Sequence, residues 1–337
     1  MNIGEIGEFG LIEKLTKDIA LKNPTTVKGV GDDAAVIAAH MEETLVSTDM
    51  LLEGVHFDLT YTPLKHLGCK AAMVNFSDIY AMNGYPRQML VAIGISKRFT
   101  VEQVEEIYEG MRFACDLHGV DLVGGDTTAS LTGLTICITV VGACEPDKVV
   151  YRSGAKPADL ICVSGNLGAA YMGLLLLERE KQVFEAGGKS PQLEGHDYIV
   201  GRFLKPEARK DIVDSLREAE IVPTSMIDIS DGLSSEVLHL CKQSNVGARL
   251  FLDKIPVARD TNRMAEELNM NPMTAAFNGG EDYELLFTIP LPLHDKVKDL
   301  GKVDIIGHIV EPGQGAYIIP PDGEPIKLQA QGFVHGK

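Results

Sequence analysis

The chain has 337 residues, which is enough for two domains of ordinary size and for a substantial buried core. Its 45% hydrophobic and 23% charged content is typical of a globular protein, and no apolar stretch reaches the length of a membrane span. With 48 acidic and 31 basic residues, the formal net charge is −17, which repels nucleic acid and anionic membranes and argues against both as partners.

From the N-terminus, the first residues include Glu5 and Glu8 and lack both a basic leader and an apolar run, so we expect a cytoplasmic protein. Alternating residues predict a strand over 44–47. A helix is predicted over 63–82, because apolar residues recur there at helical spacing and Gly84 follows. Asn75 and Asp78 are three residues apart, so they share one face of this helix.

A second helix is predicted over 101–118, because Thr100 and Gln103 form a capping box and Gly119 follows the last apolar residue. Apolar or alternating runs predict strands over 89–95, 134–141, 160–164, 248–252, 284–289 and 303–309. This mixture indicates an α/β or α+β protein. Turn residues place the domain junction near 146–157, and 185–191 has the composition of a surface loop. The six cysteines are scattered singly, as is typical of reduced core residues.

Aspartates recur directly after apolar runs, each within a turn rich in Gly, Ser or Thr. Any one of them is typical of a helix cap or a turn, but six such groups together favour binding of a hard cation such as Mg²⁺, which also binds phosphate. An acidic protein can handle nucleotides in this way. The six groups lie at residues 31–33, 47–49, 75–78, 124–126, 228–232 and 279–282.

The sequence does not contain the common nucleotide-binding or hydrolase motifs in complete form. Val183 stands where a P-loop ending in Gly188-Lys-Ser190 needs its first glycine. In the dinucleotide-like run 29–34, Asp32 and Asp33 would place negative charge where the pyrophosphate binds. The chain has no G-x-S-x-G or H-E-x-x-H motif, so nucleophilic or zinc hydrolysis is unsupported. His56 is the histidine beside an aspartate group, although a lone histidine is commonly structural.

The order of these motifs resembles the thiamine-monophosphate kinase family of the PurM-like superfamily, which includes aminoimidazole ribonucleotide synthetase. The resemblance rests on the runs GVGDDAAVI, STDMLLEGVHFD, NFSDIYAMNGYP, LVGGDTT, RSGAKPADLICVSG, DISDGL and GGEDYELLFT, and on the terminal Gly332-Phe333. It implies an α/β (α+β) two-domain PurM-like fold. Residues 1–148 would form an ATP- and metal-binding domain whose sheet pairs into a dimeric barrel in a homodimer. Residues 149–337 would form a C-terminal α/β domain that completes the active-site cleft.

The implied activity is transfer of the γ-phosphoryl group of ATP to thiamine monophosphate, the last step of thiamine diphosphate biosynthesis. Several Mg²⁺ ions would assist, with ATP as co-substrate. The resemblance assigns ATP contacts to Gly125, Asp126, Arg152 and Ser230, and contacts to thiamine monophosphate to His56, Glu281 and Phe333. The metal ligands it implies are Asp33, Ser47, Thr48, Asp49, Asp78, Asp126, Asp228 and Asp231.

The chemistry of the acceptor agrees with the lack of a catalytic triad. A phosphate monoester has a second pKa near 6, so its terminal oxygen is already anionic at neutral pH and needs no general base. We therefore expect direct in-line transfer without a covalent enzyme intermediate, assisted by metal ions and by Arg152. Two alternatives stay open, namely a related PurM-like ATP-dependent synthetase and a catalytically inactive nucleotide-binding regulator.

Overall fold

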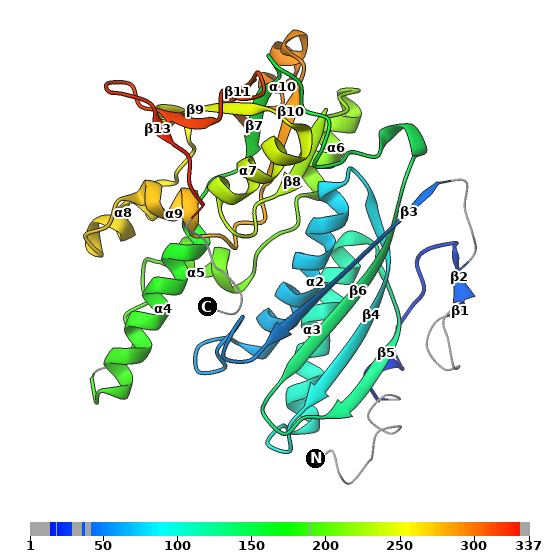
Figure 1. Cartoon of the computed structure of the whole chain (residues 1–337). Coiled ribbons are helices and arrows are strands. Elements are labelled where there is room, and N and C mark those ends of the chain that lie inside the picture. Colours follow the sequence, from blue (N-terminus) through cyan, green and yellow to red (C-terminus); the bar gives the residue numbers. More distant parts are fainter. Residues whose placement is uncertain (1–13, 18, 29–35, 38–41, 189, 331–337) are drawn as a thin grey trace. The chain divides into compact units, whose positions relative to one another are not determined.

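The computed structural model describes residues 14–17, 19–28, 36–37, 42–188 and 190–330 (Figure 1). The chain divides into two compact units, Met1–Val149 and Val150–Lys337, and each contains its own main sheet. Helices and strands mix in both units, which confirms the predicted mixed α/β class. Within the described residues, no helix is both long and apolar enough to cross a membrane.

The main sheet of the first unit has four strands in the order β3-β6-β4-β5. Their bounds are Glu43–Leu52 for β3, Thr135–Cys144 for β6, Tyr85–Ile95 for β4 and Asp121–Ala129 for β5. β6 pairs antiparallel with both β3 and β4, whereas β4 and β5 run parallel. A separate ribbon pairs β1 (Thr26–Lys28) with β2 (Val36–Ile37). The strands predicted over 44–47, 89–95 and 134–141 are confirmed, and each is longer than predicted.

Two helices, α2 (Leu64–Ala81) and α3 (Val101–His118), pack against each other and cover one face of this sheet (Figure 1). They confirm both predicted helices, including the capping box at Thr100. The two helices approach so closely at Gly68 that a Cβ there would lie 1.8 Å from the backbone oxygen of Ile107. The absence of a side chain at this position therefore permits the close packing. Along β3, Leu51 is buried while Met50 is 51% exposed. Alternate residues of β3 therefore face the helices, and those between them lie on the other face of the sheet.

The second unit has a seven-stranded sheet in the order β13-β12-β9-β11-β7-β10-β8. Neighbouring strands of this sheet are antiparallel except β9 and β12, which are parallel. The strands predicted over 160–164, 248–252, 284–289 and 303–309 are confirmed. The bounds are Leu160–Ser164 (β7), Ser225–Asp228 (β8), Gly247–Phe251 (β9), Leu285–Ile289 (β10), Val303–Val310 (β11), Ala316–Ile319 (β12) and Ile326–Lys327 (β13).

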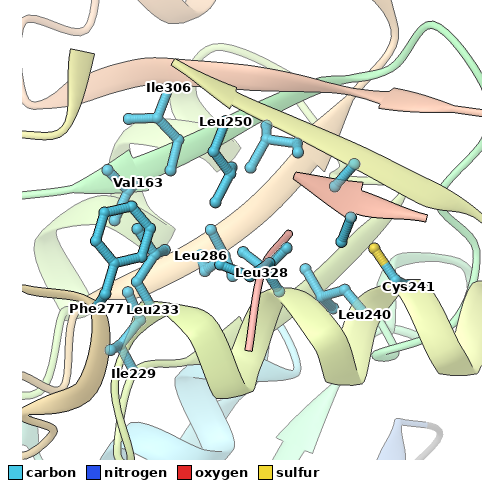
Figure 2. Packing of buried hydrophobic residues seen from close by; sticks show 14 of the residues in the cluster. Val163, Ile229, Leu233, Leu240, Cys241, Leu250, Phe277, Leu286, Ile306 and Leu328 are labelled. Atoms are coloured by element: carbon cyan, nitrogen blue, oxygen red, sulfur yellow. The ribbon is translucent and has the colours of Figure 1, made fainter. Parts of the chain in front are cut away.

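The core of this unit lies between the sheet and helix α7 (Leu233–Ser244). Figure 2 shows Leu233 and Leu240 of α7 packed with Leu250 and Leu286 of the strands. A second apolar cluster joins Met172 of α4 to residues of α5, α8 and α9. The other helices are α4 (Ala169–Glu185), α5 (Asp197–Leu204), α6 (Lys210–Glu218), α8 (Arg259–Glu267), α9 (Pro272–Asn278) and α10 (His294–Lys298). Short 3₁₀ turns cover Pro146–Lys148, Leu252–Lys254 and Leu291–Leu293.

Two further sequence predictions concern loops and cysteines. Helix α4 ends at Glu185, and the residues described between it and Pro191 are exposed and non-helical, as predicted for this loop. All six cysteines are free, and all but Cys137 are buried. The cysteines therefore contribute to packing rather than to cross-links.

Candidate functional site

A polar group lies between β3 and α2 in the first unit. The Ser47 hydroxyl donates a hydrogen bond to Oδ2 of Asp78. The backbone N–H of Asp49 donates to Oδ1 of Asn75 at 3.1 Å. Asn75 is fully buried and its amide also donates to the Ala71 oxygen at 3.0 Å, which fixes the orientation of the amide. Asn75 and Asp78 thus face the same strand, as their spacing predicted.

The electrostatics of this group favour a cation. Burial, together with the nearby negative charge of Asp78, raises the pKa of Asp49 to about 6. Two carboxylates and a hydroxyl offer only hard oxygen donors, which are the ligands that Mg²⁺ prefers. The residues present therefore fit Mg²⁺.

The group is not a complete metal cage. Within the described ranges, no three His, Cys, Asp or Glu side chains form a set that could hold a metal ion. That arrangement matches the usual mode of Mg²⁺, which takes one or two carboxylates and completes its shell with water and substrate phosphates. Asp33, another predicted ligand, lies outside the described residues.

Two predicted ligands lie on the opposite face of the sheet. Thr48 follows Ser47 on β3, so its side chain points away from α2 and lies 3.0 Å from both the Ile138 oxygen and the Thr139 hydroxyl. Asp126 pairs with Ala92 on β4, and both are exposed. The structure therefore does not bring the side chains of Thr48 and Asp126 into the group between β3 and α2.

Gly125, a predicted ATP contact, lies beside Asp126 at a bulged part of β5. Its φ is +155°, and a Cβ there would lie 1.8 Å from the Val91 oxygen. Only glycine allows this close approach of β5 to β4. The two glycines at 124 and 125 also weaken the strand signal, which is why β5 was not predicted from the sequence.

His56 lies in the turn that follows β3. The side-chain Nδ1 accepts a hydrogen bond from the Leu52 N–H at 3.1 Å, and the backbone N–H of His56 donates to the Leu52 oxygen at 2.9 Å. This geometry fixes the neutral imidazole as the tautomer with its proton on Nε2. Glu53 anchors the same turn, because its carboxylate accepts the Leu134 N–H at 2.8 Å. A half-buried His56 is therefore held at the end of the strand that carries Ser47 and Asp49.

In the second unit, the aspartate turn after β8 lies beside the segment before β10. The Glu281 N–H donates to the Ser230 oxygen at 2.7 Å, and the Tyr283 N–H donates to the Ile229 oxygen at 2.8 Å. A Cβ on Gly280 would lie 2.4 Å from the same Ser230 oxygen, so a side chain does not fit there. The structure thus brings Ser230 and Glu281, which were predicted from distant motifs, into direct contact. Asp228 ends β8, and Asp231 lies one residue after Ser230.

Glu236, which the sequence reasoning missed, supports this turn. It is only 2% exposed, and its Oε1 accepts the Asp231 N–H at 3.2 Å. Burial above all, together with the charges of Asp231 and Asp228, raises the pKa of Glu236 to about 8. The signal in the sequence was a glutamate at a position on α7 where the spacing from Leu233 predicts a buried apolar residue.

Asp282 and Glu284 are two further carboxylates. The sequence analysis placed Asp282 in the aspartate group at 279–282 without giving it a role, and it missed Glu284. Each is 1% exposed. Glu284 accepts the Ser164 hydroxyl at 2.5 Å and pairs with Arg209 and, at 3.0 Å, with Arg202. Burial raises the pKa of Asp282 to about 7, although Arg202 acts in the opposite direction. Alternating carboxylates in front of the apolar strand β10 were the signal for this pair.

The remaining predicted residues lie elsewhere. The Arg152 oxygen accepts a hydrogen bond from the hydroxyl of Ser244, the last residue of α7. The aspartate turn precedes the first residue of α7, so the backbone of Arg152 lies beside the opposite end of this helix. Phe333 lies outside the described residues.

Comparisons with known proteins agree on one family. The family described as AIR synthase related protein, N-terminal domain, matches residues 31–144. The chain is 34% identical over 335 residues to the thiamine-monophosphate kinase of Aquifex aeolicus, covering 99% of this chain and 100% of that protein. It is 32% identical to the Bacillus subtilis enzyme of the same name, covering 98% and 99% of the two chains. A solved structure of AaThiL complexed with AMPPCP and TMP matches with a TM-score of 0.77 and 33% identity, covering 99% of both chains.

Proposed function

The chain belongs to the thiamine-monophosphate kinase family, and from this membership we propose that it transfers the γ-phosphoryl group of ATP to thiamine monophosphate. The products are thiamine diphosphate and ADP. The similarity to AaThiL carries the proposal, because it extends over the whole length of both chains and that protein was solved with AMPPCP and TMP bound. AMPPCP is an analogue of ATP, so both co-substrates of the proposed reaction have a counterpart in that complex.

The reaction needs positioning more than acid–base chemistry. The acceptor phosphate brings its own anionic oxygen, which attacks the γ-phosphorus of ATP in line with the leaving ADP. The main barrier is repulsion between two polyanions. Mg²⁺, when bound, neutralises phosphate charge. The protein's own part is to hold the oxygen donors that fix the cation, and to bind and orient the two substrates.

We assign the Mg²⁺ ligands first to Ser47, Asp49 and Asp78, because their side chains gather between β3 and α2. The other proposed ligands are Asp33, Thr48, Asp126, Asp228 and Asp231. ATP contacts are assigned to Gly125, Asp126, Arg152 and Ser230. Contacts to thiamine monophosphate are assigned to His56, Glu281 and Phe333. The tautomer of His56 supports its role, because the proton on Nε2 is suited to donate to a phosphate oxygen.

The proposed active form is a homodimer in which the four-stranded sheets of two copies pair into a barrel. The face of this sheet away from α2 and α3 supports this assembly. On β3 it exposes Val46, Met50 and Leu52, which are 65%, 51% and 38% exposed. Three apolar side chains on the same face of one strand form a patch that a second copy would remove from water.

Product analysis tests the proposed function. Purified protein is incubated with ATP, Mg²⁺ and thiamine monophosphate, and the products are separated by ion-pair chromatography. We expect thiamine diphosphate and ADP in equal amounts, with none formed in EDTA or by Asp78→Asn. ATP binding without any ADP formation would indicate the inactive regulator. ADP formed only when an amide or carboxylate acceptor replaces thiamine monophosphate would indicate a synthetase.

A further inference from the structure

The segment from Gly280 to Tyr283 has an uncommon backbone. Glu281 and Tyr283 are not glycines, yet their φ angles are +61° and +51°, and Gly280 precedes them with +71°. An L-residue enters this left-handed region only at a conformational cost. Such a segment persists only where its surroundings hold it, and strained backbone of this kind gathers at functional sites. The residue between the two left-handed positions is Asp282.

Asp282 is held through both its carboxylate and its carbonyl. Its Oδ2 accepts the N–H of Gly168, which precedes the first residue of α4, at 2.7 Å. Its backbone oxygen accepts from Nη2 of Arg202 at 3.0 Å, and the same nitrogen donates to the Asn166 oxygen at 3.4 Å. The close fit extends to Gly168, where a Cβ would lie 2.7 Å from the Ala276 nitrogen. Asp282 thus joins the strained segment to the start of a 17-residue helix.

The Asp282 carboxylate contributes more than packing, as its charged neighbours show. Arg202 pairs with Glu284 at 3.0 Å, whereas its Nη2 lies 3.9 Å from Oδ1 of Asp282. Within the described residues, Oδ1 is buried without a hydrogen-bond partner. A carboxylate that is 1% exposed and only partly satisfied stabilises a fold poorly compared with an apolar residue of the same size. Asp282 does take one orientation, because the helix N-terminus binds its Oδ2 while the guanidinium binds its backbone oxygen.

We infer that Asp282 is a positioning residue that holds Glu281 beside Ser230 for contact with the acceptor substrate. Asp282 is 1% exposed, so in this inference it acts through the backbone of Glu281, whose N–H donates to the Ser230 oxygen at 2.7 Å. The role of Glu281 in this inference rests on the proposed function. Loss of the Asp282 carboxylate releases the left-handed segment, so the position of the Glu281 side chain becomes less defined.

The test compares Asp282→Asn with a matched control, Glu180→Gln. Glu180 is also buried in the second unit, and it too accepts a backbone N–H, that of Gln192 at 2.8 Å. For Asp282→Asn the amide oxygen still accepts the Gly168 N–H, but the bond is no longer charge-assisted. We therefore expect the KM for thiamine monophosphate to rise about tenfold, with the KM for ATP changed less than about twofold. The control should leave both constants near wild type. Because Asp282 acts through Glu281, its substitution should add little in a Glu281→Gln background.

Hydrogen exchange gives a readout that does not depend on the reaction. In Asp282→Asn the amides of the peptide over 279–285 should exchange faster, while a peptide over β5 should be unchanged. Unchanged exchange together with an unchanged KM for thiamine monophosphate would overturn the inference. Equal losses in both KM values and in kcat, additive with Glu281→Gln, would show a merely structural role and would also overturn it. A wild-type protein that fails to phosphorylate thiamine monophosphate would refute the proposed function, and the exchange comparison would still decide the role of Asp282.

Discussion

Replacing Asp49 by Asn should abolish turnover and at the same time stabilise the metal-free protein. The Asp49 carboxylate lies half-buried near Asp78, and together burial and this neighbouring charge raise its pKa from the ordinary 3.8 to about 6. The folded state therefore binds the proton more tightly than the unfolded chain does. The stability that this proton contributes is complete below about pH 4 and is lost as the pH rises to about 6. Above that pH, the ionised carboxylate destabilises the fold.

The size of the effect follows from the same pKa. Each pKa unit corresponds to about 1.4 kcal/mol, so the ionised Asp49 could destabilise the fold by about 3 kcal/mol. Solvent screens a half-buried group, and we therefore expect about 1–2 kcal/mol at pH 8. For a unit of this size, that corresponds to a rise in Tm of roughly 2–8 °C in Asp49→Asn. The hydrogen bond to Asn75 is kept, because it comes from the backbone N–H of residue 49.

The measurement is thermal and urea unfolding in EDTA, at pH 8 and, in dilute solution, at pH 5. Asp147→Asn is the control, because Asp147 is exposed and its loss reports the general effect of removing one negative charge from a chain of net charge −17. The advantage of Asp49→Asn over wild type should be clearly smaller at pH 5 than at pH 8. Added Mg²⁺ and ATP should stabilise the wild type more than the variant.

If Asp49→Asn is no more stable than Asp147→Asn at pH 8, the ionised Asp49 carboxylate does not destabilise the metal-free fold. If Asp49→Asn retains near wild-type turnover, Asp49 does not bind a cation that the reaction needs. The assignment of the group between β3 and α2 as a Mg²⁺ site would then be wrong.

Three further outcomes are expected. His56→Ala should raise the KM for thiamine monophosphate roughly ten- to hundredfold, as for a lost hydrogen bond to a phosphate, with little change in the KM for ATP or in Tm. A large fall in Tm with an unchanged KM for thiamine monophosphate would show that His56 is a structural residue instead. Because the acceptor supplies the attacking oxygen, γ-labelled ATP alone should leave no labelled protein on a denaturing gel, and a stoichiometric phosphoprotein would contradict direct transfer. Glu236→Gln should be more stable than wild type in EDTA, by a margin that grows from about pH 5 to about pH 8. Burial raises the pKa of Glu236 to about 8 in the folded state, so the folded wild type loses stability as the pH rises and the unfolded chain ionises first. A margin that stays constant with pH in urea titrations would contradict this effect.

Local patterns in the sequence predicted both long helices, several strands and the chemistry available to the protein. The capping box at Thr100 and the helical spacing of apolar residues in α2 and α3 predicted both helices, because these signals depend on residues three or four apart. The same short-range geometry placed Asn75 and Asp78 on one face. The recurrent aspartates predicted a site made of hard oxygen donors. The motif order predicted the family to which the chain belongs.

Which of these groups meet depends on how the chain folds. Ser47 contacts Asp78 across 31 residues of chain, and Glu281 meets Ser230 across a longer interval. A strand turns neighbouring side chains to opposite faces, so Ser47 faces α2 while Thr48 does not. Glu236 looks like an ordinary polar residue in the sequence and Asp282 like one more turn aspartate, and their burial depends on the packing of α7 and α4 against distant segments. Local patterns fix the elements through short-range interactions, whereas a site forms from contacts whose partners are chosen by the packing of the whole unit.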